Sequence, residues 1–387
     1  MRRIHTEGAA VGVILVLALL VRLLTRTAAL PVDVNADEYA WAWDGQSLII
    51  DHSPSSWSYL VHPTQCPCIA DPVNGHLFPL EHPWLDEPPL FALVVGGVAV
   101  AAGETTPARV TPDVIRVVPD VLSVLTLLLG YLLARRLLGR VVAFGFALSF
   151  AFSPTMILAG SLVEAEWMLA PMLLAALLLT GVRTRRASVG LLALCLLAPL
   201  AKETGVLVAL SVAAVLLTER RWRLAGAALG AAGAGLLLFV GWAFVLDWSQ
   251  LVAVIHAQSL RHTSAPGSLA AFLFDLRGGY GGRLRFNDPV WFLGLAAVLV
   301  AVTVMARHRR SGALSVVALP VLATSALMAL TSPATGIYNG WYRLAIYPLV
   351  YIAAAWLLVA GARWSGSRMG ALRQRGSGSS AASTKAA

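Results

Sequence analysis

Long apolar runs separated by short polar segments dominate the chain. A run of about 20 apolar residues is long enough to cross a bilayer as one helix, and tight polar turns join many of the runs here. The pattern predicts ten transmembrane helices, over residues 8–30, 113–134, 141–153, 162–181, 187–200, 204–218, 222–246, 289–306, 313–330 and 341–361. Residues 1–361 are therefore expected to form one all-α, polytopic membrane domain.

The composition supports the membrane class. Of the 387 residues, 58% are hydrophobic and 13% are charged, a balance that exceeds the needs of a soluble core. The net charge of +9 comes from short basic clusters between apolar runs, so it does not imply a nucleic-acid partner. Residues 362–387 are rich in Gly, Ser, Ala and Arg and predict a disordered, basic cytoplasmic tail.

The basic residues set the expected orientation, because cytoplasmic segments carry an excess of Lys and Arg. With the N-terminus inside, 19 of the 29 basic residues fall on the cytoplasmic side. These include four clusters, Arg135/Arg136/Arg140, Arg183/Arg185/Arg186, Arg220/Arg221/Arg223 and Arg307/Arg309/Arg310. The protein is thus expected in the cytoplasmic membrane of a cell, surrounded by lipid bilayer.

Acidic residues have the opposite distribution. Only Glu7 and Glu219, of 20 Asp and Glu residues, belong to cytoplasmic segments. Acids contribute little to orientation, so this concentration indicates either ordinary solvated loops or a carboxylate-rich site on the outer face.

The apolar run from Pro88 to Ala102 does not fit as a crossing. Counted as a span, it would invert every later loop and place the arginine clusters outside. A helix lying in the outer leaflet fits better, since the run starts at Pro88-Pro89 and ends at Gly103. We therefore expect an interfacial helix here.

Two predicted outer loops, residues 31–87 and 247–288, are long enough to build a site. A short helix is expected near the start of the first, capped by Asn35 or Asp37. Asp37, Trp41 and Asp44 would share one face of it. A carboxylate beside an indole ring suits a sugar, whereas an interfacial aromatic belt with solvated acids is the alternative.

The order of these motifs resembles the GT-C glycosyltransferases, in particular the protein O-mannosyltransferases and the lipid A aminoarabinose transferases. After a first span, Asp37-Glu38 opens an outer helix and Glu87-Pro88-Pro89 closes the loop. The other matching positions, in chain order, are Gly103, Arg116, Ser153-Pro154, Glu164, Ala201-Lys202 and Trp341-Tyr342-Arg343. Each match is weak alone, but their order and common side make the combination more specific.

The resemblance implies an inverting transfer of a sugar, with mannose favoured, from a polyprenyl-phosphate carrier to an acceptor that the sequence does not identify. Asp37 would be the general base that deprotonates the acceptor hydroxyl, with Glu38 assisting. A phosphate leaving group needs cations, and Arg116, Lys202 and Arg343 are the candidates. Trp41, Asp44, Glu87 and Glu164 would complete the substrate site.

Several of these positions have structural alternatives. Arg116 could form an ion pair with Asp120, four residues on, and Lys202 could pair with Glu203. A basic, glycine-rich segment that includes Arg283 could grip a phosphate, close as a lid or meet lipid headgroups. Of Glu164 and Glu166, two positions apart, at most one is expected to face the site.

A metal site has little support from spacing. His62, Cys66, Cys68, His76 and His82 lie near one another, but Cys-Pro-Cys is not a usual zinc signature. No metal ligand is therefore assigned, although Mg²⁺ or Mn²⁺ could serve as cofactor, as in some GT-C relatives. A transporter or flippase of a lipid-linked substrate, or a non-catalytic membrane scaffold, remains the alternative to an enzyme. A transporter would favour charges at mid-membrane and an internal repeat.

Overall fold

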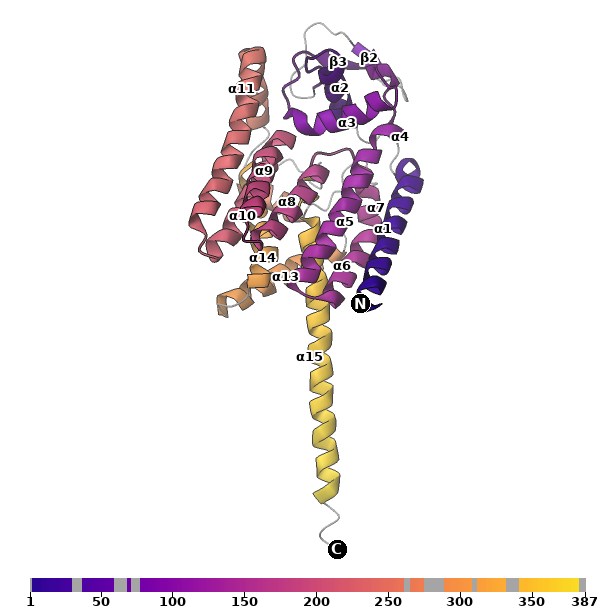
Figure 1. The fold of residues 1–387 in the computed structure, drawn as a ribbon, viewed down its shortest axis with the longest axis vertical. Helices are drawn as coiled ribbons and strands as arrows, with labels where there is room; N and C mark the ends of the chain where they lie inside the picture. Colours follow the sequence, from indigo (N-terminus) through magenta and orange to yellow (C-terminus); the bar gives the residue numbers. More distant parts are fainter. Residues whose placement is uncertain are drawn as a thin grey trace.

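The chain is a helical bundle with a small layer covering one end (Figure 1). A computed structural model describes residues 2–29, 37–58, 68–70, 77–260, 265–274, 289–307, 312–331 and 341–382. The bundle helices are α1 (Arg2–Ala29), α5 (Val117–Leu137), α6 (Arg140–Phe152), α8 (Glu166–Thr180), α9 (Arg185–Ala201), α10 (Val206–Thr218), α11 (Trp222–Leu260), α13 (Pro289–Arg307), α14 (Gly312–Thr331) and α15 (Tyr347–Ala382). Short helices α4 (Pro112–Ile115), α7 (Pro154–Ala159) and α12 (Ala265–Phe274) connect or flank them.

The apolar runs of the sequence became helices. Each of the ten predicted spans overlaps one of the bundle helices. In the part of the chain that the structure describes, six helices are long and apolar enough to cross a membrane, over Thr6–Arg26, Pro112–Leu137, Trp222–Leu260, Pro289–Arg307, Gly312–Leu330 and Tyr347–Ser365. The expected class, an all-α polytopic membrane protein, is confirmed, while a count of ten crossings stays a prediction.

Three of the predicted cytoplasmic arginine clusters lie at one end of the bundle, beside the start of α1. Glu7 forms ion pairs with Arg135, at 2.7 Å, and Arg140, at 3.6 Å. Arg136 donates a hydrogen bond to the Leu178 carbonyl at the end of α8, and Arg221 donates one to the Thr180 carbonyl. Because an α-helix ends with unpaired carbonyls, these arginines cap α8. We call this the arginine end.

A thin outer layer covers the opposite end of the bundle. It consists of α2 (Asp37–Ile50), α3 (Pro89–Ala101) and a three-stranded antiparallel sheet of β1 (Ser56–Trp57), β2 (Cys68–Ala70) and β3 (Leu77–Glu81), in the order β1-β3-β2. Figure 1 shows α3 running across the bundle end instead of along the bundle axis, as expected for an interfacial helix. The sequence did not predict the strands.

Two glycines let α2 and α3 approach closely. A Cβ on Gly45 would collide with the Ala92 backbone, and one on Gly96 would collide with the backbone of Gly45 and Gln46. Neither collision can be relieved by a rotamer change, because the opposing atoms are main chain. The close pairing of α2 and α3 therefore depends on both glycines.

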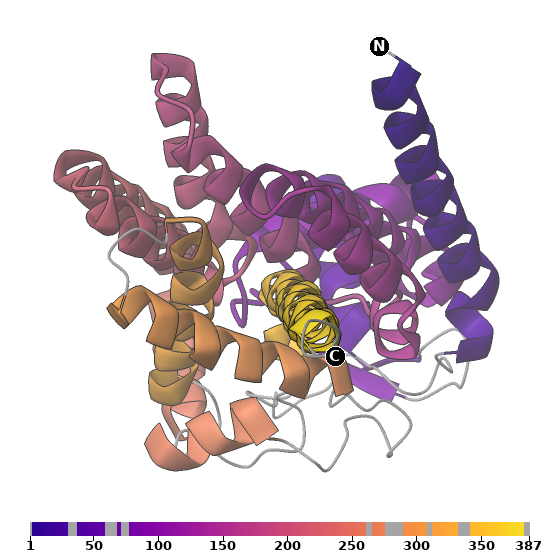
Figure 2. The ribbon, with the colours of Figure 1, turned by 90° about the horizontal axis from the view of Figure 1, so that it is seen from below.

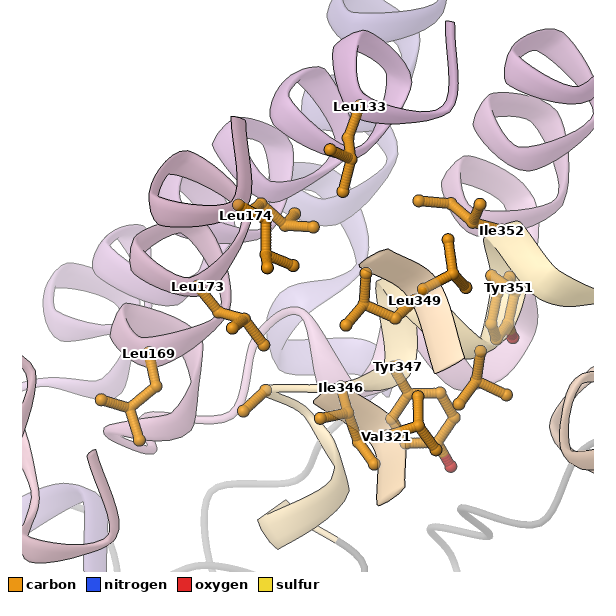
Figure 3. Packing of buried hydrophobic residues seen from close by; sticks show 14 of the residues in the cluster. Leu133, Leu169, Leu173, Leu174, Val321, Ile346, Tyr347, Leu349, Tyr351 and Ile352 are labelled. Carbon is orange, nitrogen blue, oxygen red and sulfur yellow. The ribbon is translucent and has the colours of Figure 1, made fainter. Parts of the chain in front are cut away.

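The main core fills the centre of the bundle. Leu133 of α5, Leu173 of α8 and Leu349 of α15 point into a cluster of buried side chains (Figure 3). Seen from the arginine end, α15 lies near the middle of the bundle and α1 at its edge (Figure 2). Close packing of this kind fixes the relative positions of the helices that carry the outer layer.

Two helices depart from the expected boundaries. The span predicted to end at residue 246 continues as α11 to Leu260, with non-helical backbone at Asp247, whose Oδ1 accepts from the Gln250 amide and so caps the outer segment. At the other end, α15 continues through Ala382, so helix occupies most of the tail expected to be disordered from residue 362. A helix already nucleated in a packed span extends at little cost per residue.

Candidate functional site

A buried ion pair anchors the first turn of α2. The Nε and Nη2 atoms of Arg116 donate to the two carboxylate oxygens of Glu38, at 2.8 and 2.9 Å, and neither side chain is exposed. The Nη1 atom of Arg116 donates to the Arg26 carbonyl. Burial raises the pKa of Glu38, and the Arg116 charge opposes that rise. The bidentate pair thus ties α2 to α1 and to the start of α5.

One face of α2 carries carboxylates toward the segment that precedes α3. Asp44 is 1% exposed and Asp86 is 9% exposed, and the Ser58 hydroxyl donates to Asp86 at 2.6 Å. Burial raises the pKa of Asp86 to about 7, and the charges of Glu81 and Asp37 add to the rise. Burial also raises the pKa of Asp44 well above its usual range, with Asp86 contributing. Asp37, at the start of α2, is half-buried.

Lys202 is enclosed between acids and aromatic rings. Its Nζ lies 3.1 Å from Glu166 and 3.6 Å from Glu87, and its side chain is 4% exposed. The same ammonium is 5.8 Å from the ring centre of Trp41 and 5.1 Å from that of Tyr342, within cation–π range. Burial opposes the charged form of Lys202, but Glu166 and Glu87 more than offset it and hold its pKa well above the usual value.

The surroundings of Glu87 favour its uncharged form, whereas those of Lys202 favour its charged form. Burial is the main cause that raises its pKa well above the usual value, and repulsion from Glu203 adds to it, while Lys202 opposes the rise. Glu87 therefore favours its neutral form. Asp86, whose pKa is about 7, is about half ionised at neutral pH, so the Asp86-Glu87 edge carries less than its full negative charge there.

A cavity of about 590 Å³ opens beside this edge. Its polar end is formed by Asp86, Glu87, Glu203 and Tyr342. Apolar side chains of α11 and α14 form most of the remaining wall, among them Leu236, Phe239, Val254, Leu327 and Met328. A cavity with one polar end and a long apolar wall suits an amphiphile whose head lies near Lys202.

The bundle and its outer layer can be compared with solved structures. ArnT from Cupriavidus metallidurans, solved with undecaprenyl phosphate, is similar over 90% of this chain and 59% of its own, with 18% identity and a TM-score of 0.59. The archaeal oligosaccharyltransferase AglB from Archaeoglobus fulgidus, solved with an inhibitory peptide and a dolichol-phosphate, is similar over 94% of this chain and 52% of its own, with 14% identity and a TM-score of 0.53. The chain has the GT-C fold. It spans little more than half the length of either protein.

The sequence supports the GT-C assignment over part of the chain. Residues 86–244 match the family of dolichyl-phosphate-mannose-protein mannosyltransferases. None of the curated proteins matches the chain with significant sequence similarity. The matched segment contains Glu87, Arg116, Glu166 and Lys202, so it covers most of the charged groups described above but not Asp37.

Three residues expected to contact substrate are buried inside the protein. They are Arg116, Trp41 and Arg343. Arg116 is fully buried and donates two hydrogen bonds to Glu38. Asp120, which sequence spacing offered as its partner, accepts a hydrogen bond from Ser161 and interacts electrostatically with Arg116. Trp41 is 3% exposed and packs edge-on against Trp84 and Phe91, which leaves no free ring face for a sugar. These aromatic contacts hold α2 on the outer layer.

Arg343 is also fully buried. Its Nε donates to the Phe272 carbonyl, and its guanidinium lies 5.1 Å from the ring centre of Trp291, so it joins the end of α12 to α13. Glu164 is 2% exposed, in the turn before α8. Arg283 lies outside the described residues, as do residues 261–264 and 275–288 of the second outer loop and His62, Cys66 and His76 of the first.

Two acids at the site were not selected from the sequence. Glu166 is the closest carboxylate to Lys202, although the family spacing favoured Glu164. Asp86 borders the cavity, as does Tyr342 of the Trp341-Tyr342-Arg343 match. Glu166 and Asp86 lie within two residues of a selected acid, so neighbours of a family motif could have been included on that ground. Among the described residues, no group of three or more His, Cys, Asp or Glu is arranged to hold a metal ion, and a divalent cofactor stays a prediction.

Proposed function

We propose that the chain is a membrane glycosyltransferase that takes a sugar from a polyprenyl-phosphate carrier. The observation that carries the proposal is the cavity between α11 and α14, whose apolar wall ends at Asp86, Glu87 and Tyr342 beside Lys202. An isoprenoid chain fits the apolar wall, and its phosphate fits the polar end. The two solved proteins of the same fold were captured with undecaprenyl phosphate and with a dolichol-phosphate.

Lys202 is the cation best placed for that phosphate among the described residues. Glu87, Glu203 and Tyr342, which surround it, all border the cavity. A neutral Glu87 can donate a hydrogen bond to a phosphate oxygen, whereas an ionised one would repel it. The raised pKa of Glu87 therefore makes the acidic edge compatible with an anionic headgroup. Positive charge at the phosphate would stabilise the leaving group as the glycosidic bond breaks.

Asp37 is the proposed general base. It is half-buried at the start of α2, and its charge acts on Asp86, which borders the cavity. Its carboxylate would take the proton of an acceptor hydroxyl as that oxygen attacks the anomeric carbon from the side opposite the departing phosphate, which inverts the configuration. Glu38, bonded to Arg116, would hold the first turn of α2, and hence Asp37, in place.

The proposed reaction takes place on the outer face of the membrane and uses mannose as the donor sugar. The cavity is lined in part by Leu85, Asp86 and Glu87 of the outer layer, and this layer covers the end of the bundle opposite the arginine end (Figure 1). Together with the positive-inside rule, this arrangement supports a reaction on the outer face of the cytoplasmic membrane. Mannose is favoured as the donor sugar because the matching family is described by dolichyl-phosphate-mannose.

The proposal is tested with purified full-length protein and a panel of polyprenyl-phosphate sugars. Donor binding is measured first, since it needs no acceptor, and transfer of labelled sugar to a cell-envelope fraction is measured second. We expect Asp37→Asn to keep donor binding and to lower turnover by a factor of about 10² to 10⁴, as for loss of a general base.

The matched control is Asp51→Asn, which removes an exposed carboxylate just after the other end of the same helix. It should leave both measurements unchanged. Near-normal turnover in Asp37→Asn would mean that another group is the base. Failure of the wild type to bind any polyprenyl-phosphate sugar would reject the function itself.

A further inference from the structure

A second polar cavity lies at the arginine end, away from the site described above. Its volume is about 350 Å³, and it is lined by Arg183, Thr184, Arg185, Ser188, Glu219 and Arg221. These residues come from the turn between α8 and α9, from the first turn of α9, and from the turn between α10 and α11. The GT-C reaction proposed above uses none of them.

The arginines of this cavity differ in their bonding. Arg221 is held by the Thr180 carbonyl and by Glu219, 3.3 Å away. Within the described part of the chain, Arg183 and Arg185 have no hydrogen bond or ion pair, and both are exposed. Because Arg221 and Glu219 offset each other, the cavity offers about two positive charges that no described carboxylate neutralises. That balance complements a group with one or two negative charges.

An apolar cavity adjoins the polar one. It has a volume of about 380 Å³, shares Glu219 with the first cavity, and is walled largely by Leu133, Leu137, Leu177, Met305 and Val316. Nearby, the Trp222 side chain is 64% exposed and Val189 is 59% exposed. Tryptophan at this level is typical of a membrane–water boundary. The two adjoining cavities can therefore hold a charged headgroup and the start of an acyl chain side by side. A free anion would need only the polar cavity.

We propose that this arginine-end cavity binds the phosphate headgroup of an anionic phospholipid. Arg183 and Arg185 contact the phosphate, the Thr184 hydroxyl, which accepts from the Ala187 amide, can donate to it, and the adjoining cavity takes part of an acyl chain. Basic pockets between transmembrane helices on the cytoplasmic side suit such headgroups. The lipid would hold together the ends of α8 and α9, whose other ends carry Glu166 and Lys202.

The test uses purified full-length protein in an uncharged detergent, with phosphatidylglycerol, phosphatidylcholine or inorganic phosphate added. The thermal midpoint is followed against ligand concentration, since a ligand of the folded state raises it by mass action. We expect phosphatidylglycerol to raise the midpoint, phosphatidylcholine to have little effect, and the double variant Arg183→Ala/Arg185→Ala to weaken the apparent affinity by about tenfold or more.

The matched control is Arg186→Ala/Arg223→Ala, which removes the same charge from exposed positions at the same end that do not line the cavity. It should keep the affinity of the wild type. An equal loss in both double variants would show diffuse attraction to a basic surface and would overturn the site. Inorganic phosphate that stabilises as well as phosphatidylglycerol would overturn the assignment of a lipid.

Discussion

Arg116 and Glu38 carry the charges on which the geometry of the outer layer depends. Both side chains are fully buried, and two hydrogen bonds join them. Loss of one partner from such a pair is costly because the other charge remains buried without compensation. The residue that looks from the sequence like a phosphate contact is, by its bonding, the anchor of the helix that carries Asp37.

Substitutions at this pair separate anchoring from phosphate binding. Arg116→Ala should destabilise the protein by about 3–5 kcal/mol, because it leaves Glu38 unpaired. Adding Glu38→Gln should recover part of the loss, since an uncharged side chain is cheaper to bury. Thermal midpoints of the single and double variants form the cycle that measures the coupling. If Arg116→Ala weakened donor binding at unchanged stability, Arg116 would instead contact the phosphate.

Asp86 should make stability depend on pH. Its pKa is about 7 in the folded protein against 3.8 for the ordinary side chain. An acid with a raised folded pKa contributes stability fully below its unfolded pKa and loses it as pH rises through the folded value. The thermal midpoint should therefore fall between pH 4 and 7, and Asp86→Asn should make this fall shallower. Asp44 and Glu87 have raised pKa values too, so part of the slope should remain. An unchanged slope in Asp86→Asn would show that Asp86 ionises normally.

At the scale of elements, the pairing of α2 with α3 shapes the outer layer. Gly45 and Gly96 put the two backbones in direct contact, and the aromatic cluster of Trp41, Trp84 and Phe91 fills the space beside them. Because α3 lies across the bundle end, it forms a platform on which α2 and the acids of the site rest.

Alanine at either of these glycines should separate the helices. Gly96→Ala should lower stability by about 1–3 kcal/mol, the range of overpacked core substitutions, and should disturb turnover through displacement of α2. Gly97→Ala is the control, because its added Cβ would meet only the end of the Ile49 side chain at 3.7 Å. Thermal midpoint and turnover are measured for both, and equal behaviour of the two variants would contradict the close contact.

The elements were largely predictable, whereas the contacts between them were not. Apolar runs gave the helices, including Pro89–Ala101, and the charge of the flanking loops predicts that this helix does not cross. A short helix near the start of the first outer loop followed from the capping residues Asn35 and Asp37, and α2 begins at Asp37. Glu38 and Arg116 are 78 residues apart in the chain, and no local pattern pairs them. Burial of Trp41 and the choice of Glu166 over Glu164 depend on packing between distant helices, which periodicity does not encode.

At the scale of the whole molecule, the two ends of the bundle differ in charge and in what they expose. One end gathers the arginines that cap α8 and bind Glu7. The other carries buried carboxylates, Lys202 and the large cavity. The helices α8 and α9 connect the two ends.

This polarity predicts the sidedness of cysteine labelling in intact cells. Cysteines placed at Thr105 and at Lys202 should react with a membrane-impermeant reagent added outside intact cells. A cysteine at Arg186 should react only after the membrane is opened. Cys66 and Cys68 are first replaced by serine, because they lie in the first outer loop and would react themselves. Since Lys202 is buried, Thr105, which is exposed, is the more sensitive reporter. Labelling at Thr105 only from the cytoplasm would mean that α3 crosses.

The separation in sequence between Glu38 and Arg116 imposes an order on biosynthesis. A ribosome makes α2 and α3 well before it completes the start of α5, so these two helices can pair while the Glu38 carboxylate still lacks its guanidinium. Arg22 in α1 waits longer for two of the three carbonyls that it bonds, because these belong to Ala151 and Met156, whereas the third belongs to Ala18 of its own helix. A nascent chain that ends before Arg116 would therefore leave Glu38 without the guanidinium that pairs with it.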